Sequence, residues 1–341
     1  MVEKIQGQIQ KGAEKGQKTY TYADHKNSGQ LSDIWFQNST EGLVLFVVFY
    51  SQACRWNRCL GCNLPSKMSI NHVDYKALIK QIDNLFSMPE VINKTGEIRK
   101  MIISNNGSIL DEATFSSTAL MYLLAKINLN LPMLQVLDLE TRPEYVDLEE
   151  LEFIARTLQE GDTPTQLEIS IGFEAFDCKI RNEFFNKGLE LKIFESFVKR
   201  IAPYGFNLKC YFMQKPVPGM TDAEGIEDIQ AGIRYLSNIA QKYGIAINMH
   251  LNPTYVAYGT QLEVAFLKGD YYPPYLKDVA QAVLAARSES LTVFVGLFDE
   301  GMAVKDGSFV RSGDKALLAA LEHFNRTQNF DMLQQAMPRI V

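Results

Sequence analysis

The chain has 341 residues, 46% of them hydrophobic, with a formal net charge of −6 and five cysteines, which is enough for one large α/β domain or two small ones. The acidic balance gives no global support to a nucleic-acid-binding protein, and the longest apolar run, residues 43–50, is far too short to span a bilayer. The polar start resembles neither a signal peptide nor an anchor, so we predict a soluble, cytoplasmic protein with no membrane partner.

Residues 1–41 are polar, with lysine, glycine and glutamine scattered through them. We expect an N-terminal extension that is partly ordered at best until about residue 34. Its lysines are more typical of a solvated tail than of a site for an anionic substrate, and they include Lys4, Lys11, Lys15 and Lys18.

From residue 43, strand-like runs alternate with helical patterns. Residues 43–49 form a continuous apolar run, which is typical of a strand buried on both faces. Further strands are predicted at residues 98–103, 134–139, 167–173, 206–213, 244–250 and 291–297. Helices are predicted at residues 72–86, 115–127, 148–158, 190–202, 222–242, 276–286 and 314–325. Capping-box residues open two of these helices, Asp147 with Glu150 and Thr221 with Glu224.

This alternation indicates βαβ units and a parallel sheet. Six units and a seventh strand predict an α/β fold, a partial (β/α)6 TIM-like barrel with N- and C-terminal extensions. A doubly wound open sheet is the alternative. We divide the chain into an N-terminal extension (1–41), the barrel (42–290) and a C-terminal strand/helix appendage (291–341).

Three cysteines, Cys54, Cys59 and Cys62, follow the first predicted strand with the spacing C-x4-C-x2-C. Loops at this end of a parallel barrel carry the chemistry. A disulfide is disfavoured by the low cysteine content and the lack of a secretory signal. Structural zinc needs a fourth ligand, and the nearest candidate, His72, falls at a predicted helix start. Three thiolates can instead bind three irons of a cubane and leave the fourth iron open to a small molecule.

Polar residues also follow the next two strands. The turn after the second strand contains Ser104, Asn105, Asn106 and Gly107. Asn-Gly is a turn signal, which favours a structural role, although glycine would also let backbone amides approach a ligand. Glu140 and Arg142 share one face at the end of the third strand. They form either a surface ion pair or a site in which the carboxylate accepts hydrogen bonds from a ribose diol.

The remaining strand ends carry four further candidates. Glu174 follows Gly172, a position where the backbone can approach a flat ring closely. Lys187 lies at a predicted helix end, where it either complements the helix dipole or neutralises a ligand carboxylate. Lys215 and His250 are candidate catalytic residues that could meet at the barrel mouth, although a lone histidine at a strand end is more often structural.

The cysteine loop resembles that of radical S-adenosylmethionine (SAM) enzymes, whose usual spacing is C-x3-C-x2-C and which often have an aromatic residue where this chain has Gly61. Seven further stretches resemble the elongator-type branch of that superfamily, most closely the group that includes the radical-SAM component of archaeosine synthase, which modifies a 7-deazaguanine in tRNA. The resemblance covers residues 43–300, roughly. The stretches are Asn106 to Asp111, Glu140 to Glu144, Leu167 to Glu174, Asn186 to Gly188, Lys215 with Pro216, Asn252 to Thr254, and Tyr272 to Tyr275.

The resemblance implies that the three cysteines bind a 4Fe-4S cluster. It also implies a SAM pocket lined by Ser104, Asn105, Asn106, Gly107, Glu140, Arg142, Glu174 and Lys187. In that superfamily an electron donor reduces the cluster, and SAM is cleaved to methionine and a 5′-deoxyadenosyl radical that abstracts hydrogen from the substrate. Two features depart from the archaeosine group: the cysteine loop is shorter, and residues 299–311 contain no further cysteine.

Only Cys178 and Cys210 lie outside the loop, too few for an auxiliary cluster. We therefore predict a single-cluster radical SAM enzyme, an oxidoreductase or transferase that acts on a small molecule or modified nucleoside. One alternative is a tRNA-modifying enzyme with a basic rim that includes Lys209 and Lys215, although the net charge does not support it. The other is a non-catalytic iron–sulfur or zinc-binding protein.

Overall fold

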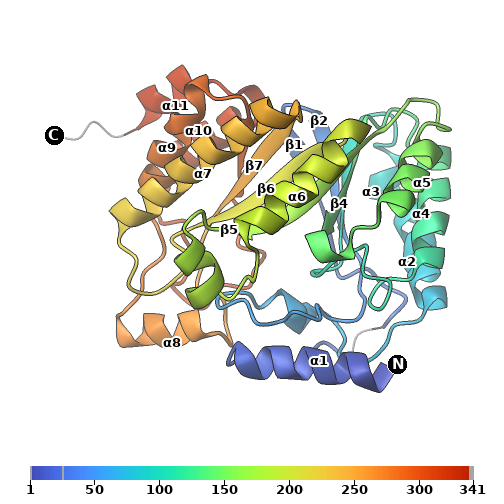
Figure 1. The fold of residues 1–341 in the computed structure, drawn as a ribbon, viewed down its shortest axis with the longest axis horizontal. Helices are drawn as coiled ribbons and strands as arrows, with labels where there is room; N and C mark the ends of the chain where they lie inside the picture. Colours follow the sequence, from blue (N-terminus) through green and yellow to red (C-terminus); the bar gives the residue numbers. More distant parts are fainter. Residues whose placement is uncertain (1, 25–26, 338–341) are drawn as a thin grey trace.

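Eight strands form one curved sheet in the computed structural model, which describes residues 2–24 and 27–337 (Figure 1). Strands β2 to β8 run parallel in chain order, and β1 pairs antiparallel with β2. The strands are β1 (Asp33–Ser39), β2 (Gly42–Val48), β3 (Ile98–Ser104), β4 (Val136–Thr141), β5 (Gln166–Glu174), β6 (Asn207–Gln214), β7 (Ile247–Pro253) and β8 (Thr292–Val295).

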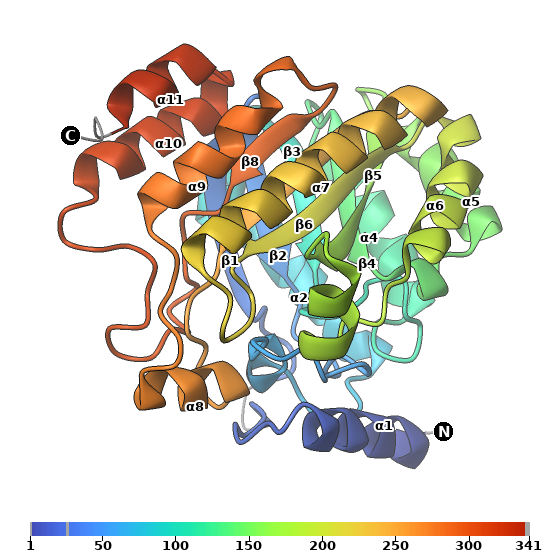
Figure 2. The ribbon, with the colours of Figure 1, turned by 60° about the vertical axis from the view of Figure 1, so that its left-hand side comes forward.

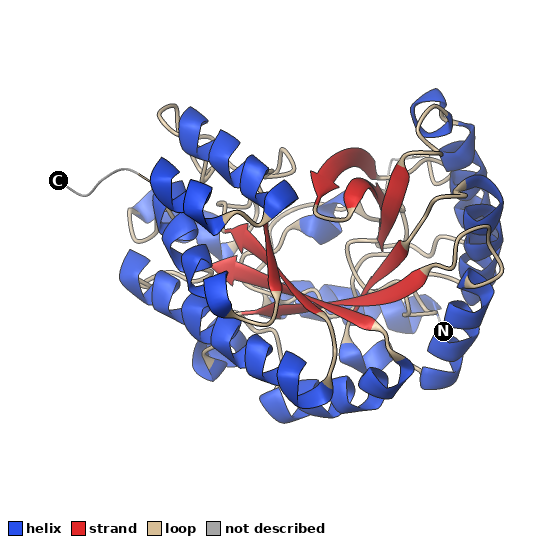
Figure 3. Cartoon of the chain, turned by 90° about the horizontal axis from the view of Figure 1, so that it is seen from above, coloured by secondary structure: helices blue, strands red, loops and turns tan. Residues whose placement is uncertain are grey.

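Helices cover the outer side of this sheet (Figure 3). The α-helices are α1 (Val2–Lys15), α2 (Tyr75–Ser87), α3 (Pro89–Ile92), α4 (Ser117–Asn130), α5 (Leu148–Leu158), α6 (Leu191–Ile201), α7 (Asp222–Tyr243), α8 (Gln261–Lys268), α9 (Leu276–Val283), α10 (Lys315–Thr327) and α11 (Phe330–Ala336). Short 3-10 segments are Leu64–Lys67, Pro143–Tyr145, Ala202–Tyr204 and Leu284–Ser288, and Ile180–Phe184 is a π-helical turn. No helix in the described part of the chain is long and apolar enough to cross a membrane.

The predicted fold class is confirmed. Each of the seven predicted strands is present, and the parallel sheet curls into a partial barrel with its helices outside (Figure 3). The capping box of Thr221 and Glu224 opens α7 as predicted. At α5 the side chain of Asp147 caps the helix by accepting hydrogen bonds from the backbone N–H groups of Glu149 and Glu150.

The N-terminal extension is more ordered than expected, because it contains α1 and β1. Ile5 and Ile9 of α1 are buried in a small apolar cluster with residues of β2 and β3. This order depends on tertiary packing, since two isoleucines four residues apart are a weak sequence signal. The domain boundaries after residues 41 and 290 remain predictions. Met1, residues 25–26 and residues 338–341 fall in the predicted terminal segments but lie outside the described residues.

Alternating side chains of the barrel strands face opposite sides. In β4, Leu137 and Leu139 lie in the main apolar core that packs against the helices. Asp138 and Glu140 point the other way, toward the inside of the barrel, where polar and charged side chains from β5 and β6 meet them. The inside of the barrel therefore carries polar and charged side chains, and the main apolar core lies between the sheet and its helices.

Helix α10 contacts both β1 and β8, the two edge strands of the sheet. Asn325 of α10 and Gln328, the residue that follows the helix, pair through their side chains with the free backbone edge of β8. Asn325 bonds the N–H and C=O groups of Val295 at 2.8 Å each, and Gln328 bonds those of Val293 at 2.9 and 2.7 Å. These amides satisfy backbone groups that a neighbouring strand would otherwise bind.

Candidate active site

A cavity of about 750 Å³ opens at the carboxyl end of the barrel strands. Three thiols line it, those of Cys54, Cys59 and Cys62. It is also lined by seven of the eight residues predicted for a SAM pocket, namely Ser104, Asn106, Gly107, Glu140, Arg142, Glu174 and Lys187. Segments far apart in the sequence thus supply one continuous surface.

The cysteine loop is anchored to the strand ends that follow it. Arg55 donates two hydrogen bonds of 2.6 Å to the carboxylate of Asp111, in the arrangement that fixes a guanidinium most firmly. The Trp56 indole N–H donates to the carbonyl of Asn186 at 2.7 Å. A Cβ on Gly107 would lie 3.3 Å from the Cα of Cys54, so glycine allows this turn to lie directly against the loop.

Burial and nearby cations act in opposite directions on two thiols of the loop, and burial has the larger effect. Burial raises the pKa of Cys59 and raises that of Cys62 to about 12, while nearby cations oppose this effect. Lys187 and Arg142 act on Cys59, and Lys18 acts on Cys62. A bound cation or cluster would keep these sulfurs as thiolates.

The three thiols do not form a single-ion site. Within residues 2–24 and 27–337, no three Cys, His, Asp or Glu side chains are grouped closely enough to hold one metal ion. His72, the nearest candidate for a fourth zinc ligand, is exposed and is absent from the cavity lining.

Glu140 and Arg142 have different partners from those expected. Tyr211 on β6 donates a hydrogen bond to Glu140, and burial raises the pKa of this carboxyl. Arg142 does not hold Glu140; its Nε donates to Glu144 at 2.5 Å, and its guanidinium carbon lies 4.2 Å from the centre of the Trp56 ring. Tyr211 therefore positions the carboxylate, while Arg142 braces the cysteine loop.

Lys187 and Glu174 form an ion pair of 2.6 Å inside the cavity. Burial lowers the pKa of Lys187, but Glu174 and Cys59 together more than offset this effect and the net pKa is raised. A Cβ on Gly172 would lie 2.2 Å from the ammonium nitrogen of Lys187 and 2.5 Å from Glu174 Oε1. The glycine thus leaves room for the pair to lie across its strand.

Asn105 is the one predicted pocket residue that does not line the cavity. It is buried, and its amide donates hydrogen bonds to the hydroxyls of Ser51 and Thr114. Its role is to hold the turn, which was the structural interpretation of the Asn-Gly signal. Ser104 and Asn106 on either side of it do line the cavity.

Four cavity-lining residues other than glycine have left-handed backbone conformations. They are Asn57 (φ 41°), Asn106 (φ 54°), Glu174 (φ 75°) and Glu300 (φ 56°). Such conformations cost energy and cluster where a side chain must be aimed at a site. Glu174 lies where the pairing of β5 with β6 shifts by one residue, so the irregularity points its carboxylate at Lys187.

No family model matches the chain. It is 28% identical over 262 residues to archaeosine synthase subunit beta of Methanosarcina acetivorans, a match that covers 74% of this chain and 69% of that protein. An uncharacterized protein of Methanocaldococcus jannaschii is 22% identical over 311 residues, 89% of this chain and 81% of its own length. Queuine lyase from Clostridium spiroforme, solved with SAM and queuine, aligns with a TM-score of 0.47 at 16% identity over 77% of this chain and 95% of that one.

The chain is similar to archaeosine synthase subunit beta. This relative confirms the resemblance predicted from the motifs that follow the cysteine loop. The two sequences are 28% identical over the 262 residues that align.

The candidate catalytic residues do not meet. His250 is buried in the cavity wall, with ring centroids 4.8 Å from those of both Tyr211 and Phe294. Burial lowers its pKa well below the ordinary value, so the imidazole is neutral. Lys215 is absent from the cavity lining and pairs with Asp222 at 2.7 Å, where α7 begins. A catalytic role for Lys215 therefore has no geometric support.

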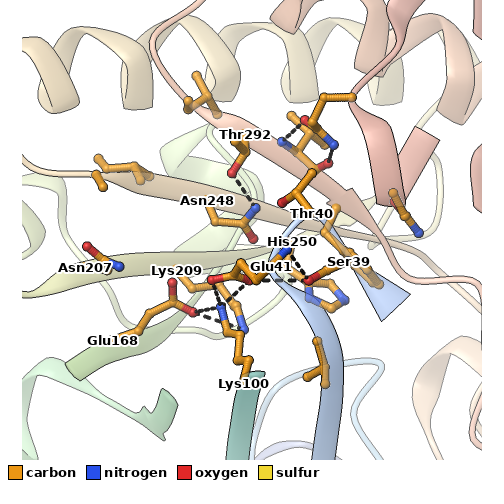
Figure 4. A pocket seen from close by; sticks show the side chains of 18 of the residues that line it. Ser39, Thr40, Glu41, Lys100, Glu168, Asn207, Lys209, Asn248, His250 and Thr292 are labelled. Atoms are coloured by element: carbon orange, nitrogen blue, oxygen red, sulfur yellow. Dashed lines mark hydrogen bonds and ion pairs between the residues drawn. The ribbon is translucent and has the colours of Figure 1, made fainter. Parts of the chain in front are cut away.

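A second cavity, of about 460 Å³, lies at the opposite end of the barrel strands (Figure 4). Lys100 pairs there with Glu168 at 2.6 Å and with Glu41 at 2.8 Å, and Lys209 pairs with Asp138 and Glu168. Burial raises the pKa of Glu168, but Lys209 and Lys100 more than offset it and the net pKa is lowered. Lys209 is thus a buried structural cation and does not belong to a basic rim, as the tRNA hypothesis had expected.

Glu300 is a cavity carboxyl that the sequence did not single out. Burial raises its pKa to about 7, with Lys67 acting in the opposite direction. An acid with a raised pKa binds its proton more tightly when folded, so its contribution to stability is lost as pH rises from the unfolded value through 7.

We expect Glu300→Gln to remove this loss. The free energy of unfolding of the variant, relative to that of the unmodified protein, should be higher at pH 8 than at pH 5.5. The increase should be roughly 1 kcal/mol after allowance for partial exposure. Urea unfolding at both pH values measures the difference, with Glu322→Gln in the same cavity as the control. Parallel pH profiles for the two proteins would contradict a raised pKa at Glu300.

Proposed function

We propose that this chain is a radical SAM enzyme. The observation that carries the proposal is the convergence of three thiols and the Glu140, Arg142, Glu174 and Lys187 side chains on one cavity. Sequence similarity to a synthase subunit supports an enzymatic role. The proposed cofactors are one 4Fe-4S cluster and SAM.

In this proposal Cys54, Cys59 and Cys62 hold the cluster, with the fourth iron open to SAM. A cluster held there would supply the one-electron chemistry for reductive cleavage of SAM and for abstraction of hydrogen from the substrate. The reduction requires an external electron donor. The chain's own task is to bind, orient and shield these groups from water.

The pocket residues divide that task by charge. Lys187, free to exchange Glu174 for a ligand, offers an ammonium to the carboxylate of SAM. Glu140, held by Tyr211, offers a carboxylate to the hydroxyls of the ribose. The turn from Ser104 to Gly107 lies against Cys54 and presents backbone and small side chains to the amino end of SAM.

The opposite part of the cavity is suited to the substrate. It is lined by aromatic side chains that include Trp35, which stacks on Phe46 with 4.1 Å between ring centroids. Neutral His250 and the amide of Asn252 add polar contacts. Such a surface fits a small molecule or a modified nucleoside better than a highly charged ligand. The reaction is of the oxidoreductase or transferase class, in the cytoplasm.

A tRNA-modifying enzyme of the archaeosine-synthase kind is the second candidate, favoured by the name of the relative. The net charge of −6 and the burial of Lys209 give no additional support to an RNA-binding face. Binding of tRNA that weakens steeply with salt would support this candidate, because phosphate contacts release counterions.

The deciding experiment is anaerobic reconstitution with iron and sulfide, followed by addition of SAM and dithionite. We expect about four irons and four sulfides per chain and the appearance of 5′-deoxyadenosine by mass spectrometry. A chain that forms a cluster but neither binds nor cleaves SAM would be a non-catalytic iron–sulfur protein. A chain that binds only zinc would refute the cluster as well.

A further inference from the structure

The N-terminal strap, defined here as residues 12–22, lies directly over the cysteine loop. It consists of the last turn of α1 and the residues that follow it, and both α1 and α8 lie at the same end of the molecule in two views (Figures 1 and 2). Backbone contacts tie it to the segment before α8: the N–H of Thr19 donates to the carbonyl of Gly259 at 3.0 Å. The strap therefore covers the loop from the outside.

Lys18 makes the central contact. Its ammonium group donates to the backbone carbonyl of Cys59 at 2.5 Å, of Leu60 at 3.1 Å and of Cys62 at 2.8 Å. An ammonium group has three N–H donors, so this turn of the loop uses all of them. The lysine is partly buried and pairs with no carboxylate among the described residues.

Two tyrosines of the strap fix the loop next to Cys59. Tyr20 donates from its hydroxyl to the side-chain oxygen of Asn57 at 2.6 Å, and Asn57 donates to the hydroxyl of Tyr22 at 2.8 Å. Asn57 is buried and has the left-handed φ of 41°, so these bonds hold a backbone conformation that is otherwise unfavourable.

Two glycines allow the strap to approach this closely. A Cβ on Gly12 would lie 2.5 Å from the carbonyl oxygen of Trp56, and one on Gly16 would lie 3.0 Å from the Cα of Arg58. Both contacts are to backbone atoms, which cannot move aside as a flexible side chain could. The strap is thus fitted to the loop along its whole length.

We infer that the strap is part of the cluster site and that Lys18 is a positioning residue for the cluster, an inference that rests on the proposed function. Lys18 holds three carbonyls of the ligand turn and places a positive charge beside it. A positive charge stabilises the more negative, reduced form of a cluster and so raises its reduction potential.

The test compares Lys18→Met, which keeps the length of the side chain and removes its charge, with Lys18→Arg and with Lys15→Met at an exposed neighbouring position. The midpoint potential of the reconstituted cluster is measured by a redox titration followed by electron paramagnetic resonance. Loss of iron to a chelator is timed separately. Neither readout depends on turnover of SAM.

For Lys18→Met we expect a more negative midpoint potential and loss of iron about tenfold faster, as for other contacts behind metal ligands. Lys18→Arg and Lys15→Met should both stay near the unmodified protein. If Lys18→Met assembles no cluster but Lys18→Arg does, a cation at this position is required, which also supports the inference.

Equal potentials and equal rates of iron loss in Lys18→Met and the unmodified protein would overturn the inference. The inference would also be overturned if neither Lys18→Met nor Lys18→Arg held a cluster while their circular dichroism was unchanged. Cluster binding would then depend on the shape of the side chain at position 18 and not on its charge. If the unmodified protein binds no cluster, the proposed function itself fails, and this outcome is distinct from the others.

Discussion

Replacement of Cys59 by alanine is expected to reduce formation of 5′-deoxyadenosine to the level of an enzyme-free control. The loop supplies three thiols, and a 4Fe-4S cluster held by them, as we propose, would keep only two protein ligands in this variant. Iron content and 5′-deoxyadenosine are measured after anaerobic reconstitution with SAM and dithionite.

Cys178→Ala is the matched control. This thiol is exposed, lies outside the cavity and is 3.8 Å from a carboxylate oxygen of Glu190. The control should retain its iron and its rate of SAM cleavage. Full activity in Cys59→Ala, or equal losses in both variants, would refute the assignment of Cys59 as a cluster ligand.

The Lys209→Met substitution is expected to cost about 3–5 kcal/mol of stability, the usual range when one partner of a buried ion pair is removed. Lys209 is 3% exposed and pairs with both Asp138 and Glu168, which are 0% and 3% exposed. Without it, two buried carboxyls would share the single cation of Lys100. Urea unfolding monitored by circular dichroism gives the free energy.

Two comparisons show whether charge is the cause. Addition of Asp138→Asn to Lys209→Met should recover part of the loss, because one buried charge is removed together with its partner. Lys242→Met breaks an exposed pair with Glu195 and should change stability little. A loss below about 1 kcal/mol in Lys209→Met would show that the ion network inside the barrel is not structurally important.

The parallel strands were predictable because each is a short segment rich in apolar residues, as at 43–49 and 98–103. The alternation within β4 also carried information, since Asp138 and Glu140 could only face the inside of a barrel whose outside is apolar. The partnership of Asp138 with Lys209 was not predictable, because it joins strands separated by about 70 residues and depends on the curvature of the sheet.

Site residues that belong to a sequence motif were predictable, whereas residues that only tertiary packing brings to the site were not. The cysteines and the polar strand ends follow recognisable spacings. Lys18, by contrast, lies in a polar segment whose composition is typical of a solvated tail. The neighbouring sequence does not indicate that its ammonium group donates hydrogen bonds to three backbone carbonyls. Tyr211 was missed for a similar reason, because the carboxylate that its hydroxyl binds, that of Glu140, lies two strands away in the sheet.

The side-chain amides of α10 that cover the edge of β8 have a consequence for how this protein could diversify. Helix α10 lies between the two edge strands of the sheet and closes the barrel there. Its residues Glu322, Asn325 and Arg326 line the cavity. The thiols and their supporting strap come from the first 62 residues. Substitutions in α10 can therefore reshape this wall of the cavity while the cysteine loop and the strap stay unaltered, so the shape of the cavity can change without change to the three thiols.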